Sequence, residues 1–124
     1  MYIKDYPIVV FNNSIHDESF GLIKARSIFF SDDRKTFVEN EIILSEEELL
    51  ENSVVKILDI INEQNDSMIG MYEDDIIDSN EVKQNCLIEI EDFCRNHVCS
   101  VKVLQLIDLL KWAIDQDKNV YFLF

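Results

Sequence analysis

The chain has 124 residues, of which 48% are hydrophobic, with eight Phe, four Tyr and one Trp. This length and apolar content predict one folded domain with a single core, and they exclude an intrinsically disordered chain, which lacks enough apolar surface to offset the ordering of its backbone. Two Gly and one Pro argue against a Gly-rich phosphate loop, and a formal net charge of −14 argues against nucleic acid or an anionic membrane as partner.

The acidic residues are unevenly distributed. Between Glu39 and Asp92 lie 17 of the 25 acidic residues but only two of the 11 basic residues, so this segment has a formal charge of −15 and the rest of the chain +1. Acidity can serve solubility alone, and that interpretation stays open. Segregation into one segment favours a second interpretation, in which the acids attract a basic protein or a cation.

The first seven residues contain an acid and a proline, and no stretch has the roughly 18 apolar residues of a membrane span, so we expect neither a secretory signal nor a membrane segment. Three cysteines, an odd number, argue against a disulfide framework and fit a reducing compartment. These observations predict a cytoplasmic protein.

The first third of the chain predicts strands. Tyr2–Phe11 is rich in β-branched and aromatic residues. Phe20–Phe30 and Lys35–Leu44 flank Ser31–Arg34, a polar tetrad suited to closing a hairpin between two strands. A helix over the second segment is the alternative, because four of its residues fit one helix face: Leu22, Ile23, Arg26 and Phe30.

A helix is predicted to begin at Ser45, because Ser45 and Glu48 have the spacing of a capping box. The three glutamates of its first turn complement the positive end of a helix. Helical spacing then continues until Asn62 through Leu50, Val54, Ile57, Leu58 and Ile61.

The rest of the chain predicts a connector, two helices and a strand. Met68–Asp78 is the connector, in which Gly70 permits an unusual backbone angle. Helices follow over Asn80–His97 and Val101–Asp117, the second largely buried, and the apolar Val120–Phe124 predicts an interior strand beside the N-terminal ones. The fold class is therefore α+β: a mixed or antiparallel sheet of about four strands, three N-terminal and one C-terminal, packed by about three helices.

No catalytic set is evident. His16-Asp17-Glu18 is the densest cluster of catalytic residue types, but we expect a solvated loop there, with no matching nucleophile. Ser14 and Ser19 lack the glycines of a nucleophile elbow. We therefore predict no catalytic residues and no enzyme.

Three soft metal ligands, Cys94, His97 and Cys99, lie within six residues, with Cys86 nearby. Structural zinc sites pair close ligands from two separate turns, and this chain has no second pair. Cysteines on one helix face behave as small hydrophobes, so we predict no metal and no cofactor.

The acidic run from Glu73 to Glu81 suggests calcium at first, but Ile76 and Ile77 interrupt the register that an EF-hand loop requires. A solvated loop or a protein-binding surface remains, because apolar and aromatic residues lie among the acids. The residues predicted to bind a partner are Tyr72, Glu73, Asp74, Asp75 and Asp78, with Glu46, Glu47 and Glu51 as a second patch.

The small size, the segregated acidity and the pattern Leu109-Leu110-Lys111-Trp112-Ala113-Ile114 followed by Val120-Tyr121-Phe122 resemble the immunity proteins of bacterial polymorphic-toxin systems, including contact-dependent growth inhibition. The resemblance implies a binding protein that neutralises a cognate toxin domain, often a basic nuclease, by covering its active site or substrate groove. It defines no oligomeric state. The alternatives are an acidic adaptor or nucleic-acid mimic and, with less support, a small metal-dependent hydrolase.

Overall fold

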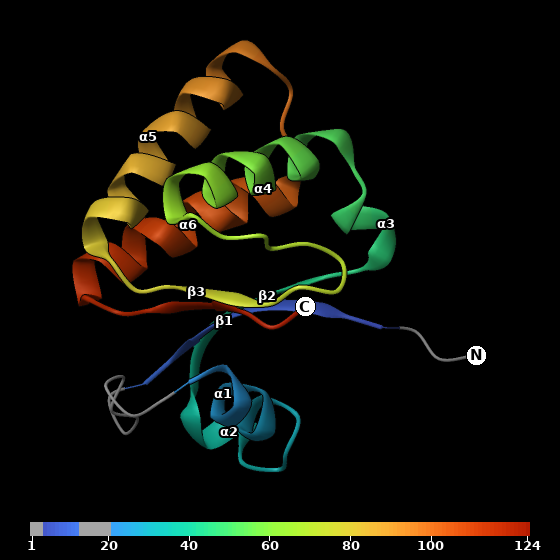
Figure 1. The fold of residues 1–124 in the computed structure, drawn as a ribbon, viewed down its shortest axis with the longest axis vertical. Helices are drawn as coiled ribbons and strands as arrows, with labels where there is room; N and C mark the ends of the chain where they lie inside the picture. Colours follow the sequence, from blue (N-terminus) through green and yellow to red (C-terminus); the bar gives the residue numbers. More distant parts are fainter. Residues whose placement is uncertain (1–3, 13–20) are drawn as a thin grey trace.

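A four-stranded antiparallel sheet runs through the middle of the molecule in the computed structural model, which describes residues 4–12 and 21–124 (Figure 1). Its order is β2-β1-β4-β3, with β1 at Tyr6–Phe11, β2 at Val38–Leu44, β3 at Asp75–Ile77 and β4 at Val120–Phe122. The two central strands, β1 and β4, lie far apart in the sequence. The predicted α+β class with a sheet of about four strands is confirmed.

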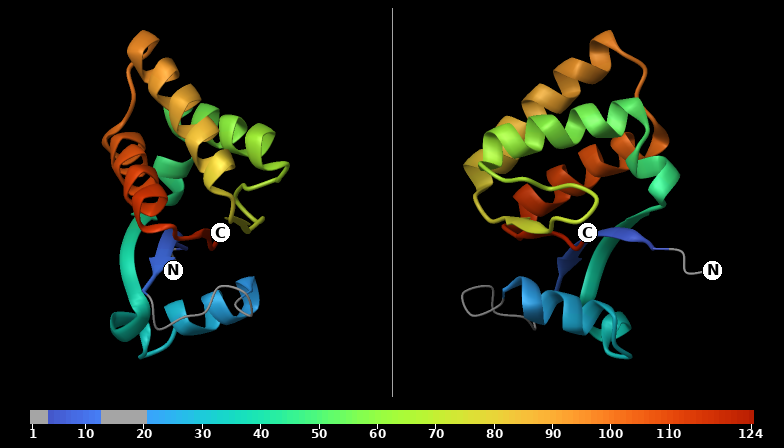
Figure 2. Two further views of the ribbon diagram at one scale, coloured as in Figure 1. Left: turned by 90° about the vertical axis from the view of Figure 1, so that its left-hand side faces the viewer. Right: turned by 45° about the vertical axis from the view of Figure 1, so that its right-hand side comes forward.

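Helices cover both faces of the sheet (Figures 1 and 2). One face carries α3 (Glu46–Leu49), α4 (Asn52–Asn65), α5 (Asn80–Asn96) and α6 (Val101–Gln116), which we call the helical layer. The opposite face carries α1 (Leu22–Phe29) and α2 (Arg34–Phe37).

Alternation along β1 divides the core in two. Tyr6, Ile8 and Val10 belong to the larger cluster, under the helical layer. Val9 and Phe11 point to the other face and pack with Ala25, Phe29, Tyr121 and Leu123. Because successive side chains of a strand point to opposite faces, a strand covered on both sides must be apolar throughout, as β1 is.

The predicted helices over Asn80–His97 and Val101–Asp117 are confirmed as α5 and α6. The Ser79 hydroxyl caps α5 by accepting a hydrogen bond of 3.2 Å from the Val82 N–H. Asp117 ends α6 in a left-handed conformation with a φ of 55°. The predicted C-terminal strand is confirmed as β4, which lies in the interior of the sheet and is fully buried.

The segment expected as a strand over Phe20–Phe30 is a helix, and the predicted hairpin with Lys35–Leu44 does not exist; Phe20 itself lies outside the described residues. Ala25 and Phe29 are the buried residues of α1, and Ser27 between them is exposed; a strand would place all three on one face, whereas a helix places only residues 25 and 29 together. The alternative of a helix here is therefore confirmed. Within the following segment, Arg34–Phe37 is also helical, and the strand begins at Val38.

Two further predictions need correction. The helix expected to run from Ser45 breaks after Leu49, because the Glu51 side chain caps a new helix, α4, by accepting from the Val54 N–H at 3.3 Å. The connector Met68–Asp78 contains the edge strand β3, which its acidic composition concealed. Gly70 has no positive φ, so it does not adopt the unusual backbone angle expected of it.

Candidate partner-binding surface

Tyr72 lies at the tip of a tight turn in the segment between α4 and β3. The Gly70 N–H donates to the Glu73 carbonyl and the Glu73 N–H donates to the Gly70 carbonyl, both at 3.2 Å. Only Met71 and Tyr72 lie between these two residues, and the Tyr72 side chain is 80% exposed. An exposed aromatic side chain on a closed turn is the kind of residue that anchors protein interfaces.

Asn62, near the end of α4, anchors the segment before this turn. Its side-chain amide donates to the Ile69 carbonyl at 2.9 Å and accepts from the Ile69 N–H at 2.7 Å. The Ser67 hydroxyl donates to the same Asn62 oxygen at 2.8 Å. Ile69 is buried in the core, so the segment that leads to Tyr72 is attached by both hydrogen bonds and packing.

Lys4 holds the turn from the other side. Its ammonium group donates to the Met71 carbonyl at 3.3 Å and to the Phe124 carbonyl at 2.9 Å. The same nitrogen lies 5.3 Å from the centroid of the Tyr72 ring and 5.0 Å from that of Tyr6. Cation–π contacts of this kind contribute about 0.5–1 kcal/mol at exposed sites. The turn is thus held in place without a partner.

Glu46 of α3 and Tyr72 of this turn both act on Tyr6 of β1. Burial raises the pKa of the Tyr6 hydroxyl, and the neighbouring Glu46 and Tyr72 raise it further. Both of these residues must therefore be near Tyr6. Both predicted patches thus have a member near Tyr6, and we call Glu46, Glu47, Tyr72 and Glu73 together the Tyr72 face.

The capping box determines which glutamates of α3 are exposed. The Glu48 N–H donates to the Ser45 hydroxyl at 3.1 Å, and the Glu48 carboxylate accepts from the Ser45 N–H at 2.9 Å. This predicted capping box is confirmed. The Glu48 carboxylate takes part in the capping box and lies 3.8 Å from the Lys102 ammonium group. Glu46 and Glu47, by contrast, are exposed.

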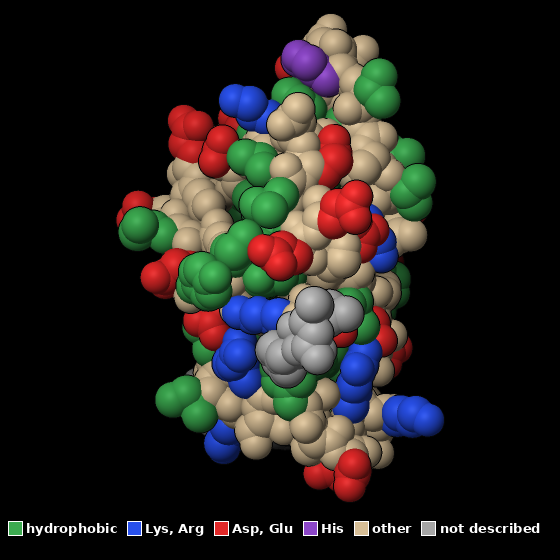
Figure 3. All heavy atoms as spheres, turned by 90° about the vertical axis from the view of Figure 1, so that its right-hand side faces the viewer, with side chains coloured by type: hydrophobic (Ala, Val, Ile, Leu, Met, Phe, Trp, Pro, Cys, Tyr) green, Lys and Arg blue, Asp and Glu red, His purple; other side chains and the backbone are tan. Residues whose placement is uncertain are grey.

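The uneven distribution of charge along the sequence places acidic side chains on the helical layer and basic side chains on the layer of α1 and α2. Of the two basic residues between Glu39 and Asp92, Lys83 is 1% exposed and donates to the Lys118 carbonyl, so its ammonium group is not presented at the surface. The face in Figure 3 shows acidic and hydrophobic side chains mixed over the helical layer, and basic side chains gathered lower down. The helices of the opposite layer carry Lys24, Arg26, Arg34 and Lys35.

The remaining predicted partner-binding residues have structural contacts or lie elsewhere. Glu51 caps α4 and accepts from the Ser53 hydroxyl, and these hydrogen bonds lower the pKa of its carboxyl group. Asp74 forms an ion pair with Arg26 of α1 at 3.4 Å. Asp75 accepts from the Ile76 N–H at 2.8 Å, and Asp78 is exposed beyond β3, at the end away from the Gly70–Glu73 turn.

Cys94 and Cys99 are joined by a disulfide, which corrects the prediction drawn from the odd number of cysteines. Their Cα atoms lie 5.7 Å apart across the connection between α5 and α6, a spacing that suits the bond. Cys86 is the free, buried cysteine, and burial raises the pKa of its thiol to about 11. His97 is exposed and stacks on Phe93 with ring centroids 4.2 Å apart. The described residues contain no group of three or more His, Cys, Asp or Glu side chains placed to hold a metal ion.

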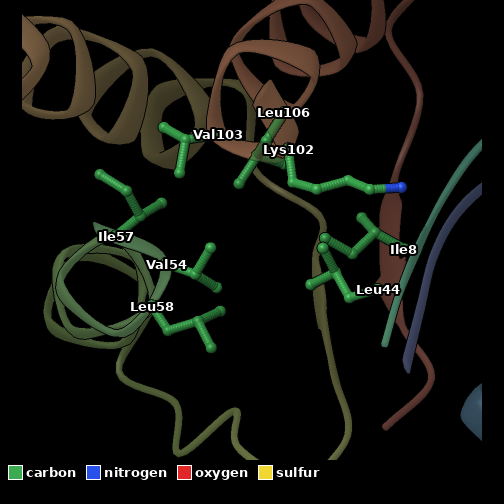
Figure 4. Close-up of a pocket in the computed structure, with 8 residues that line it drawn as sticks. All are labelled: Ile8, Leu44, Val54, Ile57, Leu58, Lys102, Val103 and Leu106. Carbon is green, nitrogen blue, oxygen red and sulfur yellow. The ribbon is translucent and has the colours of Figure 1, made fainter. Parts of the chain in front are cut away.

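The helical layer encloses a void of about 10 Å³ above the sheet (Figure 4). Apart from Lys102, its lining is aliphatic, and the Lys102 amine reaches away to the Ile43 carbonyl at 2.9 Å. A void of this size holds at most one water molecule, so it is a packing defect and not a substrate pocket. The predicted loop cluster His16-Asp17-Glu18, with Ser14 and Ser19, lies outside the described residues.

Across residues 4–12 and 21–124, no helix combines the length and apolar character that a membrane crossing requires.

Comparison with known proteins found no matching family model, no similar curated protein and no similar solved structure. The Tyr72 face is therefore identified from the geometry of this protein alone. The sequence indicated its acids and Tyr72, but Lys4 and Asn62, which hold the turn, had no sequence signal because each acts through a backbone group that only the fold brings close.

Proposed function

We propose that this protein is an immunity protein that binds a cognate, basic toxin domain and neutralises it by covering its active site or substrate groove. One observation carries the proposal: an exposed tyrosine, on a turn held by Asn62 and Lys4, and the exposed Glu46 of α3 both lie near Tyr6. A preorganised aromatic anchor next to a strongly acidic surface suits a protein whose task is to recognise a basic protein quickly and hold it.

The acidic surface accounts for fast association with a basic partner. Opposite fields raise association rate constants from about 10⁵–10⁶ M⁻¹ s⁻¹ toward about 10⁸–10⁹ M⁻¹ s⁻¹ at low salt. Since the opposite layer carries the basic side chains of α1 and α2, the field also orients the protein with its helical layer toward a basic partner. Rapid, oriented encounter is what protection against an incoming toxin requires.

The Gly70–Glu73 turn accounts for slow dissociation of the complex. A tyrosine side chain has few rotatable bonds, and the fixed backbone of the turn removes most of the ordering cost of binding. Carboxylates around the ring can occupy positions in a basic groove that would otherwise hold substrate phosphates. In this proposal the acids provide attraction and Tyr72 provides the central buried contact.

The proposed location is the cytoplasm, where an immunity protein of this kind would meet its toxin. Disulfides are rare in that compartment, so we expect Cys94 and Cys99 to be largely a dithiol in the cell and to pair on oxidation. An acidic adaptor or nucleic-acid mimic would use the same surface, and the identity of the partner separates these functions.

The experiment measures association between this protein and a purified candidate toxin domain of basic charge. The test variant reverses Glu46, Glu47 and Glu73 to Lys, and the matched control reverses the exposed Asp32, Asp33 and Asp115, which changes net charge equally. As salt rises from about 20 to 150 mM, the association rate constants of the wild type and the control should fall steeply. The association rate constant of the test variant should be low and nearly independent of salt.

A second pair of variants tests the anchor. Tyr72→Ala should raise the dissociation rate at least about thirtyfold, which corresponds to a hot spot of about 2 kcal/mol, while Tyr72→Phe should retain most of the affinity. Equal salt dependence in all proteins together with no effect of Tyr72→Ala would contradict the proposal.

A further inference from the structure

The outer edge of β2 presents backbone groups that the sheet does not use. The Leu123 N–H donates to the Pro7 carbonyl at 2.9 Å, so Pro7 faces β4 and the next residue, Ile8, faces β2, where it pairs with Ile42. Alternation then turns the N–H and C=O groups of Glu41 and Ile43 away from β1. The hydrogen bond from Lys102 to the Ile43 carbonyl independently identifies this outward side.

The other edge of the sheet is closed. On β3 the Asn65 side chain donates to the Ile76 carbonyl at 3.0 Å and the Asp75 carboxylate accepts from the Ile76 N–H. Glu41 and Ile43 of β2 turn four backbone groups outward. Among the described residues, the Ile43 carbonyl has a hydrogen-bond partner, the Lys102 ammonium group, and the Ile43 N–H and both backbone groups of Glu41 have none. Unprotected edges accept further strands, and most proteins block them, as β3 is blocked.

A surface hollow of about 420 Å³ adjoins this open edge on the side of the helical layer. It is lined by Asn40, Glu41 and Ile42 of β2 and by Gln105, Asp108, Leu109 and Trp112 of α6. Asp108 is exposed and Trp112 half-buried, and the Glu41 carboxylate is already paired with Arg34 at 2.6 Å. A carboxylate beside an indole ring favours a cationic side chain.

We propose that β2 accepts an extended segment of the basic partner as an added strand, with a Lys or Arg side chain of that segment seated between Asp108 and Trp112. Backbone hydrogen bonds to Glu41 and Ile43 provide affinity, and the hollow provides the preference for a basic side chain. The left view of Figure 2 shows β2 along the outer margin of the sheet. The identity of the partner as a basic protein rests on the proposed function.

The test changes a single backbone group. Glu41→Pro removes the outward N–H of Glu41 and leaves the hydrogen bonds between β1 and β2 intact, since proline is tolerated on an edge strand whose N–H faces solvent. Glu41→Thr is the matched control, because it loses the same carboxylate and the same ion pair with Arg34 but keeps the N–H. Asp108→Lys, against Asp108→Asn, tests the hollow at an exposed helix position where folding is not at stake.

The probes are the toxin domain and a peptide of sequence Thr-Lys-Val-Lys-Thr-Lys-Val, which presents lysines on one face when extended. Glu41→Pro should weaken binding of both probes at least about tenfold relative to Glu41→Thr, since the hydrogen bond donated by the Glu41 N–H is lost and its acceptor on the added strand is left unpaired. Asp108→Lys should weaken both more than Asp108→Asn. In the NMR spectrum of the free protein, the Glu41 and Ile43 amides should exchange faster than those of Ile42 and Leu44, and the peptide should slow them.

The outcomes separate the two proposals. If the toxin domain binds wild type, Glu41→Pro and Asp108→Lys equally, the added-strand proposal is wrong while the proposed function stands. If the toxin domain does not bind, but the peptide protects the Ile43 amide in wild type and not in Glu41→Pro, the proposed function fails and the edge site stands. Failure of the peptide to protect the Glu41 and Ile43 amides of the wild type, with unchanged toxin binding in the variants, removes the edge site altogether.

Discussion

The side-chain amide of Asn62 pairs with both backbone groups of Ile69, at 2.9 Å and 2.7 Å, in the way that a neighbouring strand would. Asn62→Ala leaves these groups unpaired and should lower the free energy of unfolding by about 1–3 kcal/mol. Thermal and urea unfolding measure this. Gln64→Ala, which removes an exposed hydrogen bond to Glu89, is the control and should cost less than about 0.5 kcal/mol. Equal effects of the two variants would show that Asn62 does not hold the segment.

Glu51 links stability to pH. Its hydrogen bonds to Ser53 and Val54 lower the pKa of its carboxyl group, so the cap contributes stability above the unfolded-state pKa and loses it as pH falls through the folded-state pKa. Glu51→Ala should cost about 1 kcal/mol at pH 7. The difference from wild type should shrink at acidic pH, because protonation removes the cap from the wild type as well. Unfolding curves at neutral and acidic pH measure it, and a difference independent of pH would contradict the assignment.

The three cysteines should react differently with a thiol reagent. In the oxidised, folded protein Cys86 should be unreactive near pH 7, because it is buried and its pKa is raised to about 11. Mild reduction should release two reactive thiols, Cys94 and Cys99, and denaturation a third. A thiol that reacts rapidly before reduction would show that the disulfide or the burial of Cys86 is wrong.

Replacing both disulfide cysteines with Ser should cost about 2 kcal/mol under oxidising conditions, since the closed loop is short. Under reducing conditions the variant should differ little from the wild type. Binding to the toxin domain should be unchanged in either case, because the disulfide lies outside the Tyr72 face. Loss of binding by the folded variant would place the connection between α5 and α6 at the interface.

Gly70→Ala should be neutral or stabilise the fold by about 0.4–1 kcal/mol. The backbone of Gly70 has no positive φ, and an added Cβ would approach the Met68 carbonyl oxygen no closer than 3.9 Å. Alanine restricts the unfolded chain and so favours the folded state where the native backbone is compatible. Clear destabilisation in a urea titration would mean that the turn needs the freedom of glycine.

Local signals account for what could be predicted. The Ser45–Glu48 capping box, the periodicity of α5 and α6 and the apolar β4 each depend on residues close together in the sequence, and all are confirmed. The secondary structure of segment 20–30 was ambiguous because its apolar residues fit both the helical and the strand period. The helix is favoured because it packs Ala25 and Phe29 against the apolar face of the sheet. β3 has three residues, one of them acidic, and exists because β4 lies beside it.

The candidate site was predicted in part for the same reason. Acids and an aromatic residue could be read directly, but only the fold brings both Glu46 and Tyr72 near Tyr6 of β1. Asp74, Asp75 and Glu51 look equivalent to Glu73 in the sequence, and only the fold distinguishes a carboxylate that supports the structure from one that is exposed.

The pairing of β1 with β4 has a consequence for synthesis. Val9 pairs with Tyr121, so the middle of the sheet joins the earliest strand of the chain to the latest. At roughly 5–20 residues per second, on the order of ten seconds pass between the emergence of β1 from the ribosome and that of β4. During that interval β1 can pair with β2, but its edge toward β4 stays open. The sheet is therefore complete only once β4 has emerged, so the proposed partner binding belongs to chains that have been synthesised at least that far.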